Sequence, residues 1–120
     1  MSKQWIAVDL DGTLAYYDRH RGIGHIGDPI MPMVERVRKW LAEGEDVRIM
    51  TARIASVEGG SEFREDEIQA NYDAIEEWCM EQFGRVLPIT CSKDYQMKEQ
   101  WDDRAIQLEP NTGRRMDGQE

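Results

Sequence analysis

The fold of this chain is decided by residues 5–14, which read WIAVDLDGTL. The first four residues are a nearly continuous apolar run, which is typical of a central strand buried on both faces of a sheet. Asp9 and Asp11 follow directly, so their carboxylates fall at the C-terminal edge of that strand. In open parallel sheets, ligands bind outside this edge. The stretch therefore predicts an α/β fold with a site at the end of its first strand.

The chain is acidic and of single-domain length. It has 120 residues, with 15 Lys and Arg against 24 Asp and Glu, so its formal net charge is −9. We expect one domain over residues 1–112, followed by a polar, disordered tail over 113–120. Attraction to phosphate backbones or anionic membranes needs clustered Lys and Arg. We therefore expect no membrane partner, and nucleic acid only as a local substrate.

The cysteines and the N-terminus indicate a cytoplasmic protein. Cys79 and Cys91 form no Cys-x-x-Cys pair, so neither a disulfide framework nor a zinc site is predicted, and both thiols are expected to be reduced. The first residues lead into only a handful of apolar ones, too few for the hydrophobic segment of a secretion signal.

Hydrophobic spacing and turn residues indicate alternating strands and helices. Pro32 suits the first turn of a helix and Gly44 its left-handed end, while Gly84 stands just past a second apolar stripe. The expected elements are strands over 5–8, 47–50, 86–90, 99–101 and 105–108, helices over 32–41 and 64–83, and loops over 15–31 and 56–61.

This alternation predicts the α/β class, with a single Rossmann-like domain whose mostly parallel central sheet carries helices on both faces. The link between the third and fourth strands is short for a helical crossover, so a helix there would be reduced to one turn.

Polar side chains follow several of the expected strands. Asp9 and Asp11 end the first strand, Thr51 ends the second, and Asp102-Asp103 end the fourth, with Lys93 in the link before it. Because like charges raise each other's pKa, clustered carboxylates usually hold a divalent cation. Hard oxygen ligands with room for water favour Mg²⁺. The sequence therefore predicts a magnesium site.

Together these residues resemble a known family. Residues 9–14, DLDGTL, resemble the DxDGT(L) signature of the haloacid dehalogenase superfamily of phosphotransferases. Thr51 is similar to the second motif of that family, Lys93 to the lysine of the third, and Asp102-Asp103 to the acidic fourth motif, in the same chain order. The resemblance implies a Mg²⁺-dependent phosphatase acting through an aspartyl-phosphate.

The resemblance spans residues 5–108, and residues 101–105 are similar to the fourth motif of small, often phage-encoded members. The gaps over 15–31 and 53–64 are too short for the cap domain that many members insert there, so an uncapped member is implied. Such members act on large substrates or borrow a lid from a partner subunit. A nucleotide or a polynucleotide end is the leading substrate that this likeness implies.

The resemblance also implies a role for each side chain. Asp9 would be the nucleophile, which splits one displacement into two easier ones. Asp11 would be the general acid and then the general base. Thr51 and Lys93 would hold the phosphoryl oxygens. The implied substrate-binding residues are Gly12, Thr13, Ala52 and Arg53, and the implied metal ligands are Asp9, Asp11 through its backbone carbonyl, Asp102, and Asp103 directly or through water.

Two points stay open at this stage. The motif lysine could instead be Lys98, which lies closer to Asp102 in the sequence, although Lys93 is favoured. The long loop after the first motif also leaves its polar and aromatic residues open: Tyr16 and Tyr17 could pack over the mouth of the site, and Arg19, His20, Arg21 and His25 could touch the substrate, or all of them could be plain surface residues.

Two other functions compete with the phosphatase. Receiver-like signalling modules also gather Asp, Thr and Lys around Mg²⁺, but their phosphorylated Asp ends a middle strand of the sequence. A non-catalytic descendant could bind a phosphorylated partner, although the presence of both Asp9 and Asp11 speaks against the loss of chemistry.

Overall fold

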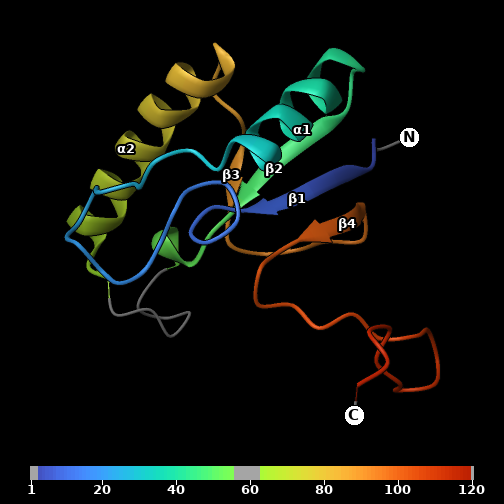
Figure 1. The fold of residues 1–120 in the computed structure, drawn as a ribbon. Helices are drawn as coiled ribbons and strands as arrows, with labels where there is room; N and C mark the ends of the chain where they lie inside the picture. The colour runs from blue at the N-terminus through green and yellow to red at the C-terminus, as the bar shows by residue number, and fades with distance from the viewer. Residues whose placement is uncertain (1–2, 56–62, 120) are drawn as a thin grey trace.

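The computed structural model describes residues 3–55 and 63–119 (Figure 1); the loop expected over 56–61 lies outside the described residues. Strands and helices alternate along the chain, as the sequence predicts. In order, the elements are β1 (Trp5–Asp9), α1 (Met31–Ala42), β2 (Asp46–Met50), the 3-10 turn η1 (Ala52–Ile54), α2 (Glu65–Phe83), β3 (Ile89–Thr90) and β4 (Met97–Trp101).

The four strands form one parallel sheet in the order β3-β2-β1-β4. Val8 of β1 pairs with Ile49 on one side and with Trp101 on the other. The strand that carries the DLDGTL motif is therefore central, and all strands end at the same edge. The α/β class with a parallel, Rossmann-like sheet in a single domain is confirmed.

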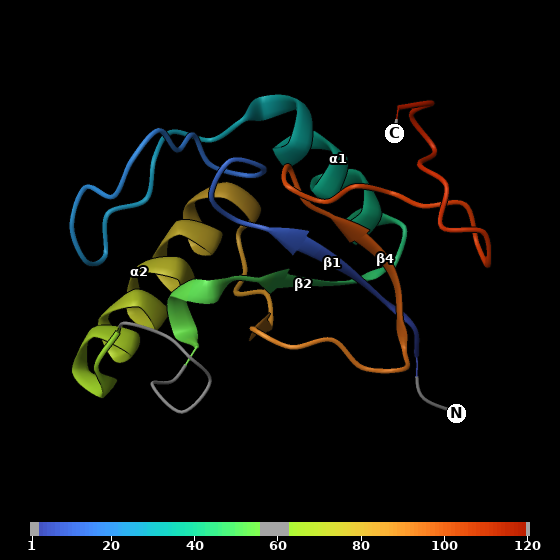
Figure 2. The ribbon, with the colours of Figure 1, turned by 90° about the horizontal axis from the view of Figure 1, so that it is seen from below.

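Both long helices cover the same face of the sheet. Ile6 and Val8 of β1 belong to one buried cluster with Val37 of α1 and with Ile75 and Cys79 of α2. Viewed from below, the strands have no helix drawn over them (Figure 2). The expectation of helices on both faces is therefore wrong. The physical reason is the link between β3 and β4, which is too short for a helical crossover and contains no helical turn.

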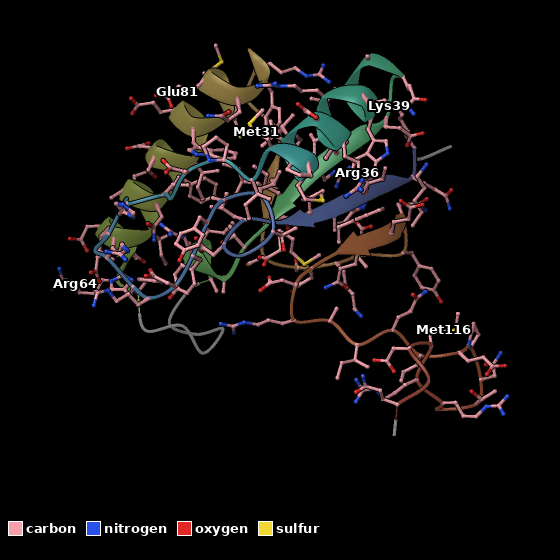
Figure 3. The ribbon with its side chains drawn as sticks, viewed as in Figure 1. Met31, Arg36, Lys39, Arg64, Glu81 and Met116 are labelled. Carbon is pink, nitrogen blue, oxygen red and sulfur yellow. The ribbon has the colours of Figure 1, made fainter. Side chains whose placement is uncertain are left out.

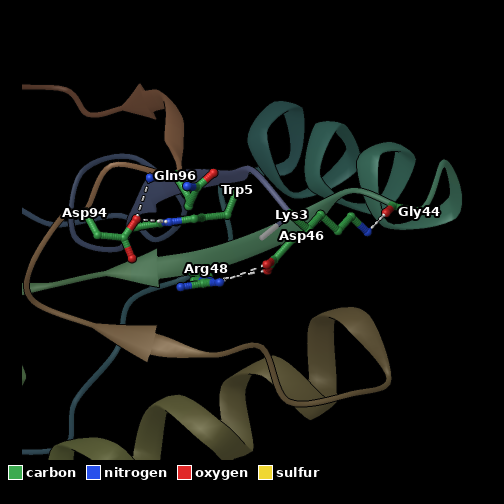
Figure 4. Close-up of polar contacts among 7 residues, drawn as sticks. All are labelled: Lys3, Trp5, Gly44, Asp46, Arg48, Asp94 and Gln96. Carbon is green, nitrogen blue, oxygen red and sulfur yellow. Dashed lines mark hydrogen bonds and ion pairs between the residues drawn. The ribbon is translucent and has the colours of Figure 1, made fainter. Parts of the chain in front are cut away.

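The helix-free face is covered by side chains and by this link instead (Figure 4). Trp5 is buried, its indole Nε1–H donates to Asp94 Oδ1 at 2.8 Å, and the Arg48 guanidinium lies 4.6 Å from its ring centre. The backbone N–H of Gln96 donates to the same oxygen of Asp94 at 2.8 Å. One indole therefore anchors the link beneath β1 where a Rossmann-like fold would place a helix.

We expect Trp5→Phe to lower the free energy of unfolding by about 1–3 kcal/mol, because it removes the hydrogen bond to Asp94 and part of the buried ring. Chemical denaturation measures this loss. A variant as stable as the wild type would show that the indole does not hold the link.

The third and the fifth expected strands differ from the sequence interpretation. β3 is shorter than the expected 86–90, and residues 105–108 form no strand, because the sheet ends at β4 and their apolar side chains lie largely exposed. Leu108 makes only an isolated bridge with Arg115. The tail expected to be disordered thus folds back in a turn, away from the sheet, where Figure 3 marks Met116.

Residues 15–30 form the long loop that the sequence predicts, without a helix or a strand, so no cap domain stands after the first motif. The loop closes at its base, where Ala15 bridges Pro29 and the Tyr16 N–H donates to Asp28 O at 2.8 Å. A Cβ on Gly27 would lie 2.0 Å from Tyr16 O, so only glycine fits this close approach. Among the described residues, no helix is long and apolar enough to cross a bilayer.

Candidate functional site

A cavity of about 470 Å³ opens at the C-terminal edge of the sheet. It collects residues from the end of β1, from β2 and η1, from the segment after β4, and from the loop and helix alongside. The lining residues are Asp9, Asp11, Tyr17, His20, Met50, Thr51, Ala52, Arg53, Ala55, Phe63, Asn71, Cys91, Asp102, Asp103 and Arg104. The predicted edge of the sheet thus carries the cavity.

Three carboxylates meet at the floor of this cavity. Asp9 ends β1, and Asp102 and Asp103 follow the neighbouring strand β4 directly. One oxygen from each lies within 4.8 Å of the others. This all-oxygen donor set is of the kind that hard divalent cations such as Mg²⁺ prefer. The side chain of Asp11 is not part of this group among the described residues.

Burial and acidic neighbours disfavour the ionised form of Asp9. Burial, a side-chain hydrogen bond with Asp103 and the charge of Asp102 together raise its pKa from 3.8 to about 7. A cation between these oxygens would offset the repulsion and favour the ionised form. A bound cation would therefore stabilise this group of carboxylates.

This raised pKa predicts how stability depends on pH without divalent cations. The folded state holds a proton on Asp9 that the unfolded state has lost, so the contribution is full below pH 3.8 and is lost as the pH rises through 7. Since the side chain is partly exposed, we expect a solvent-screened loss of about 1–2 kcal/mol. Thermal unfolding in a chelator from pH 5 to 8 should show this decline in the wild type and a weaker one in Asp9→Asn. If the stability of the two proteins changed equally with pH, Asp9 would not have the raised pKa on which this prediction depends.

The turn after β1 is locked to the segment after β4. Thr13 Oγ1 donates to Asp103 Oδ1 at 3.1 Å and accepts from the backbone N–H of Asp103 at 3.0 Å. Gly12 has φ +88°, and a Cβ there would lie 2.5 Å from Asp103 Oδ2. Gly12 and Thr13 therefore place the third carboxylate, which is a structural role beside the substrate contact predicted for them.

On the other side of Asp9, Thr51 and Arg53 extend the site from the end of β2. Thr51 is buried, and its Oγ1 accepts the backbone N–H of Arg53 at 3.2 Å, which caps η1. The guanidinium of Arg53 donates to both oxygens of Asp11, at 2.7 and 2.8 Å. Ala52 lies exposed at the cavity wall between them. The cation in contact with the DLDGTL motif is thus an arginine.

Neither lysine lies at this cavity in the part of the chain that the structure describes. Lys93 is exposed in the link before β4 and does not line the cavity, although its neighbour Cys91 does. Lys98 pairs with Glu45 at 2.7 Å, at the start of β2 and thus at the opposite edge of the sheet. Lys98 therefore lies at the wrong edge of the sheet to be the motif lysine. Lys93, which was expected to hold the phosphoryl oxygens, does not line the cavity.

Sequence reasoning missed six lining residues, which are Met50, Ala55, Phe63, Asn71, Cys91 and Arg104. Asn71 carried the clearest signal, because an amide lies on the buried side of the amphipathic helix α2, four residues before Ile75. Phe63 packs near His20, with ring centres 6.4 Å apart. Tyr17 and His20, left open by the sequence, do line the cavity.

Comparisons with known proteins support the fold. Neither the protein-family models nor the curated proteins gave a match. A solved structure described as a conserved protein coded by a locus from Bacteroides thetaiotaomicron is similar over 87% of this chain and 78% of that one, with 24% sequence identity and a TM-score of 0.53. At this identity the likeness establishes the α/β fold alone.

Proposed function

We propose that this protein is a Mg²⁺-dependent phosphomonoester hydrolase of the haloacid dehalogenase type, acting through an aspartyl-phosphate on Asp9. One observation carries the proposal: Asp9, Asp102 and Asp103 bring their oxygens within 4.8 Å of one another in a cavity that also holds Thr51 and the Asp11–Arg53 pair. Three clustered carboxylates are costly unless a cation joins them. The residues present fit Mg²⁺, which when bound would neutralise the phosphoryl oxygens and the carboxylates.

In the first step, a carboxylate oxygen of Asp9 attacks phosphorus in line. The bond from phosphorus to the ester oxygen breaks, and that oxygen receives a proton from Asp11, so the alcohol leaves. Thr51 and Arg53 line the same cavity and supply donors for the phosphoryl oxygens.

In the second step, water attacks the phosphorus of the aspartyl-phosphate. Asp11, now ionised, takes the proton of that water, and the bond from phosphorus to Asp9 breaks to release inorganic phosphate. Both steps need Asp11 to change its protonation state and one of its oxygens to face the reacting groups. In this structure Arg53 donates to both of these oxygens, so it must release at least one of them before Asp11 can act.

The proposed substrate is a nucleotide or a phosphorylated polynucleotide end, acted on in the cytoplasm. Tyr17, His20 and Phe63 give the cavity an aromatic wall on which a base could stack. The net charge of −9 favours the smaller, mononucleotide substrate, because a long polyanion would be repelled.

A panel of phosphomonoesters tests the proposal. We expect Mg²⁺-dependent release of phosphate from p-nitrophenyl phosphate, nucleotides or 5′- and 3′-phosphorylated oligonucleotides, and none in a chelator. Magnesium binding by calorimetry without turnover on any substrate would refute hydrolysis and favour a phosphate-binding module instead.

A further inference from the structure

Asn71 is a buried polar residue that the proposed chemistry does not use. Together with Thr13 and Thr51, it makes up the buried polar residues of the described chain, and the other two lie within the motifs. Burying an amide is costly unless its atoms find partners. Asn71 has two such partners, from two different segments, so its position on α2 at the cavity is specified rather than incidental.

The two partners of Asn71 are the loop over the cavity and the arginine at its wall. Its Oδ1 accepts the backbone N–H of Gly24 at 3.1 Å, and its Nδ2 donates to the backbone oxygen of Arg53 at 3.0 Å. Thr51 holds the backbone N–H of the same arginine. The backbone N–H and the backbone oxygen of Arg53 are therefore both held by hydrogen bonds from neighbouring side chains.

The guanidinium of Arg53 is hydrogen-bonded to the carboxylate of Asp11, which is the group that must transfer protons in the proposed reaction. Arg53 donates to both carboxylate oxygens of Asp11 in a pair that is largely buried, with 12% and 21% of the two side chains exposed. An acid or base needs a free oxygen facing the substrate. Planar guanidinium groups bind phosphoryl oxygens by the same paired donors that bind a carboxylate. A phosphoryl group above Asp9 therefore competes with Asp11 for Arg53.

We propose that Arg53 exchanges partners, holding Asp11 before substrate binds and the phosphoryl oxygens once it has bound, and that Asn71 is the positioning residue that anchors Arg53 for this exchange. The inference rests on the proposed hydrolase function. Until a phosphoryl group draws Arg53 away, both oxygens of Asp11 are taken by the guanidinium.

Two variants of Asn71 and one control test the anchor. Asn71→Asp keeps the acceptor for Gly24 and removes the donor to Arg53, whereas the neutral Asn71→Ala removes both. Gln69→Glu makes the same amide-to-acid change on an exposed site of α2, where the amide donates to Asp73 at 3.0 Å. Both Asn71 variants lose the buried hydrogen bond to Arg53, so we expect each to raise KM for p-nitrophenyl phosphate about tenfold and to lower kcat as well.

The control should retain the KM and kcat of the wild type. Folded Asn71 variants with wild-type kinetics would overturn the anchor, and so would equal effects in Gln69→Glu. If Asn71→Ala alone loses activity while Asn71→Asp keeps it, the loop contact with Gly24 matters and the bond to Arg53 does not, which also overturns the proposal.

A second measurement tests the exchange of Arg53 from Asp11 to phosphate, and it needs neither turnover nor a variant. We expect a crystal structure of the wild type with Mg²⁺ and inorganic phosphate to show the Arg53 guanidinium on the phosphate, with at least one Asp11 oxygen released. Phosphate bound beside Asp9 with both Arg53–Asp11 hydrogen bonds intact would overturn the exchange. It would leave the hydrolase proposal standing, since that is decided by the substrate panel.

Discussion

Asp9→Asn is expected to abolish Mg²⁺-dependent phosphate release, with kcat lower by about 10³-fold or more. An amide oxygen is a poor nucleophile towards phosphorus, so the covalent step has no replacement group. The change is nearly isosteric, and it removes charge from a carboxylate whose pKa is raised by burial and acidic neighbours. The folded state should therefore persist. Steady-state kinetics on the best substrate of the panel, with thermal unfolding as the check on folding, measures the effect.

Asp46→Asn is the matched control for this experiment. Asp46 starts β2, pairs with Trp5 in register and so lies at the opposite edge of the sheet from the cavity. Its contact with Arg48, at 2.9 Å, is a partly exposed ion pair worth about 0–1 kcal/mol. We expect wild-type turnover from this variant. Appreciable turnover in Asp9→Asn would mean that Asp9 is not the nucleophile, whatever the metal dependence.

Most of the cavity floor could be predicted because it follows directly from strands. A side chain at the end of a parallel strand has its place set by the strand itself, and the apolar runs before Asp9 and Thr51 identify those strands in the sequence. Asp102 and Asp103 follow β4 in the same way, although only the fold reveals that β4 pairs with β1. The order of the strands in the chain and their parallel direction were therefore sufficient to predict that these four residues lie at the same edge of the sheet.

Some of the features that could not be predicted depend on contacts between segments far apart in the sequence. Lys93 stands in an irregular link whose path depends on how Trp5 and Asp94 meet beneath the sheet. Which face of the sheet each helix covers depends on the direction of the connection between the strands that the helix joins. The spacing of apolar residues within a helix does not indicate that direction. Asn71 had a local signal, as a polar residue on an apolar side, but its two partners are 47 and 18 residues away in the sequence.

Gly12→Ala should disturb the acidic cluster strongly, although it removes none of the three carboxylates. The added Cβ would lie 2.5 Å from Asp103 Oδ2, so the carboxylate that Thr13 holds must move. Since groups that orient a metal ligand contribute strongly to affinity, we expect Mg²⁺ binding about 10–100-fold weaker, with turnover reduced in parallel. The positive φ adds a backbone cost of about 1–2 kcal/mol to folding. Calorimetry with Mg²⁺ and thermal unfolding measure the two effects separately.

Gly44→Ala separates the two causes. Gly44 has nearly the same backbone angle, φ +83°, yet nothing lies within 4 Å of the Cβ that alanine would add, and it follows α1 at the far end from the cavity. It should therefore show the backbone cost in its unfolding midpoint with wild-type Mg²⁺ affinity. If Gly12→Ala behaves like Gly44→Ala, losing stability but no Mg²⁺ affinity, then the placement of Asp103 by the turn after β1 does not matter for the metal, and Asp9 with Asp102 must bind it without that carboxylate.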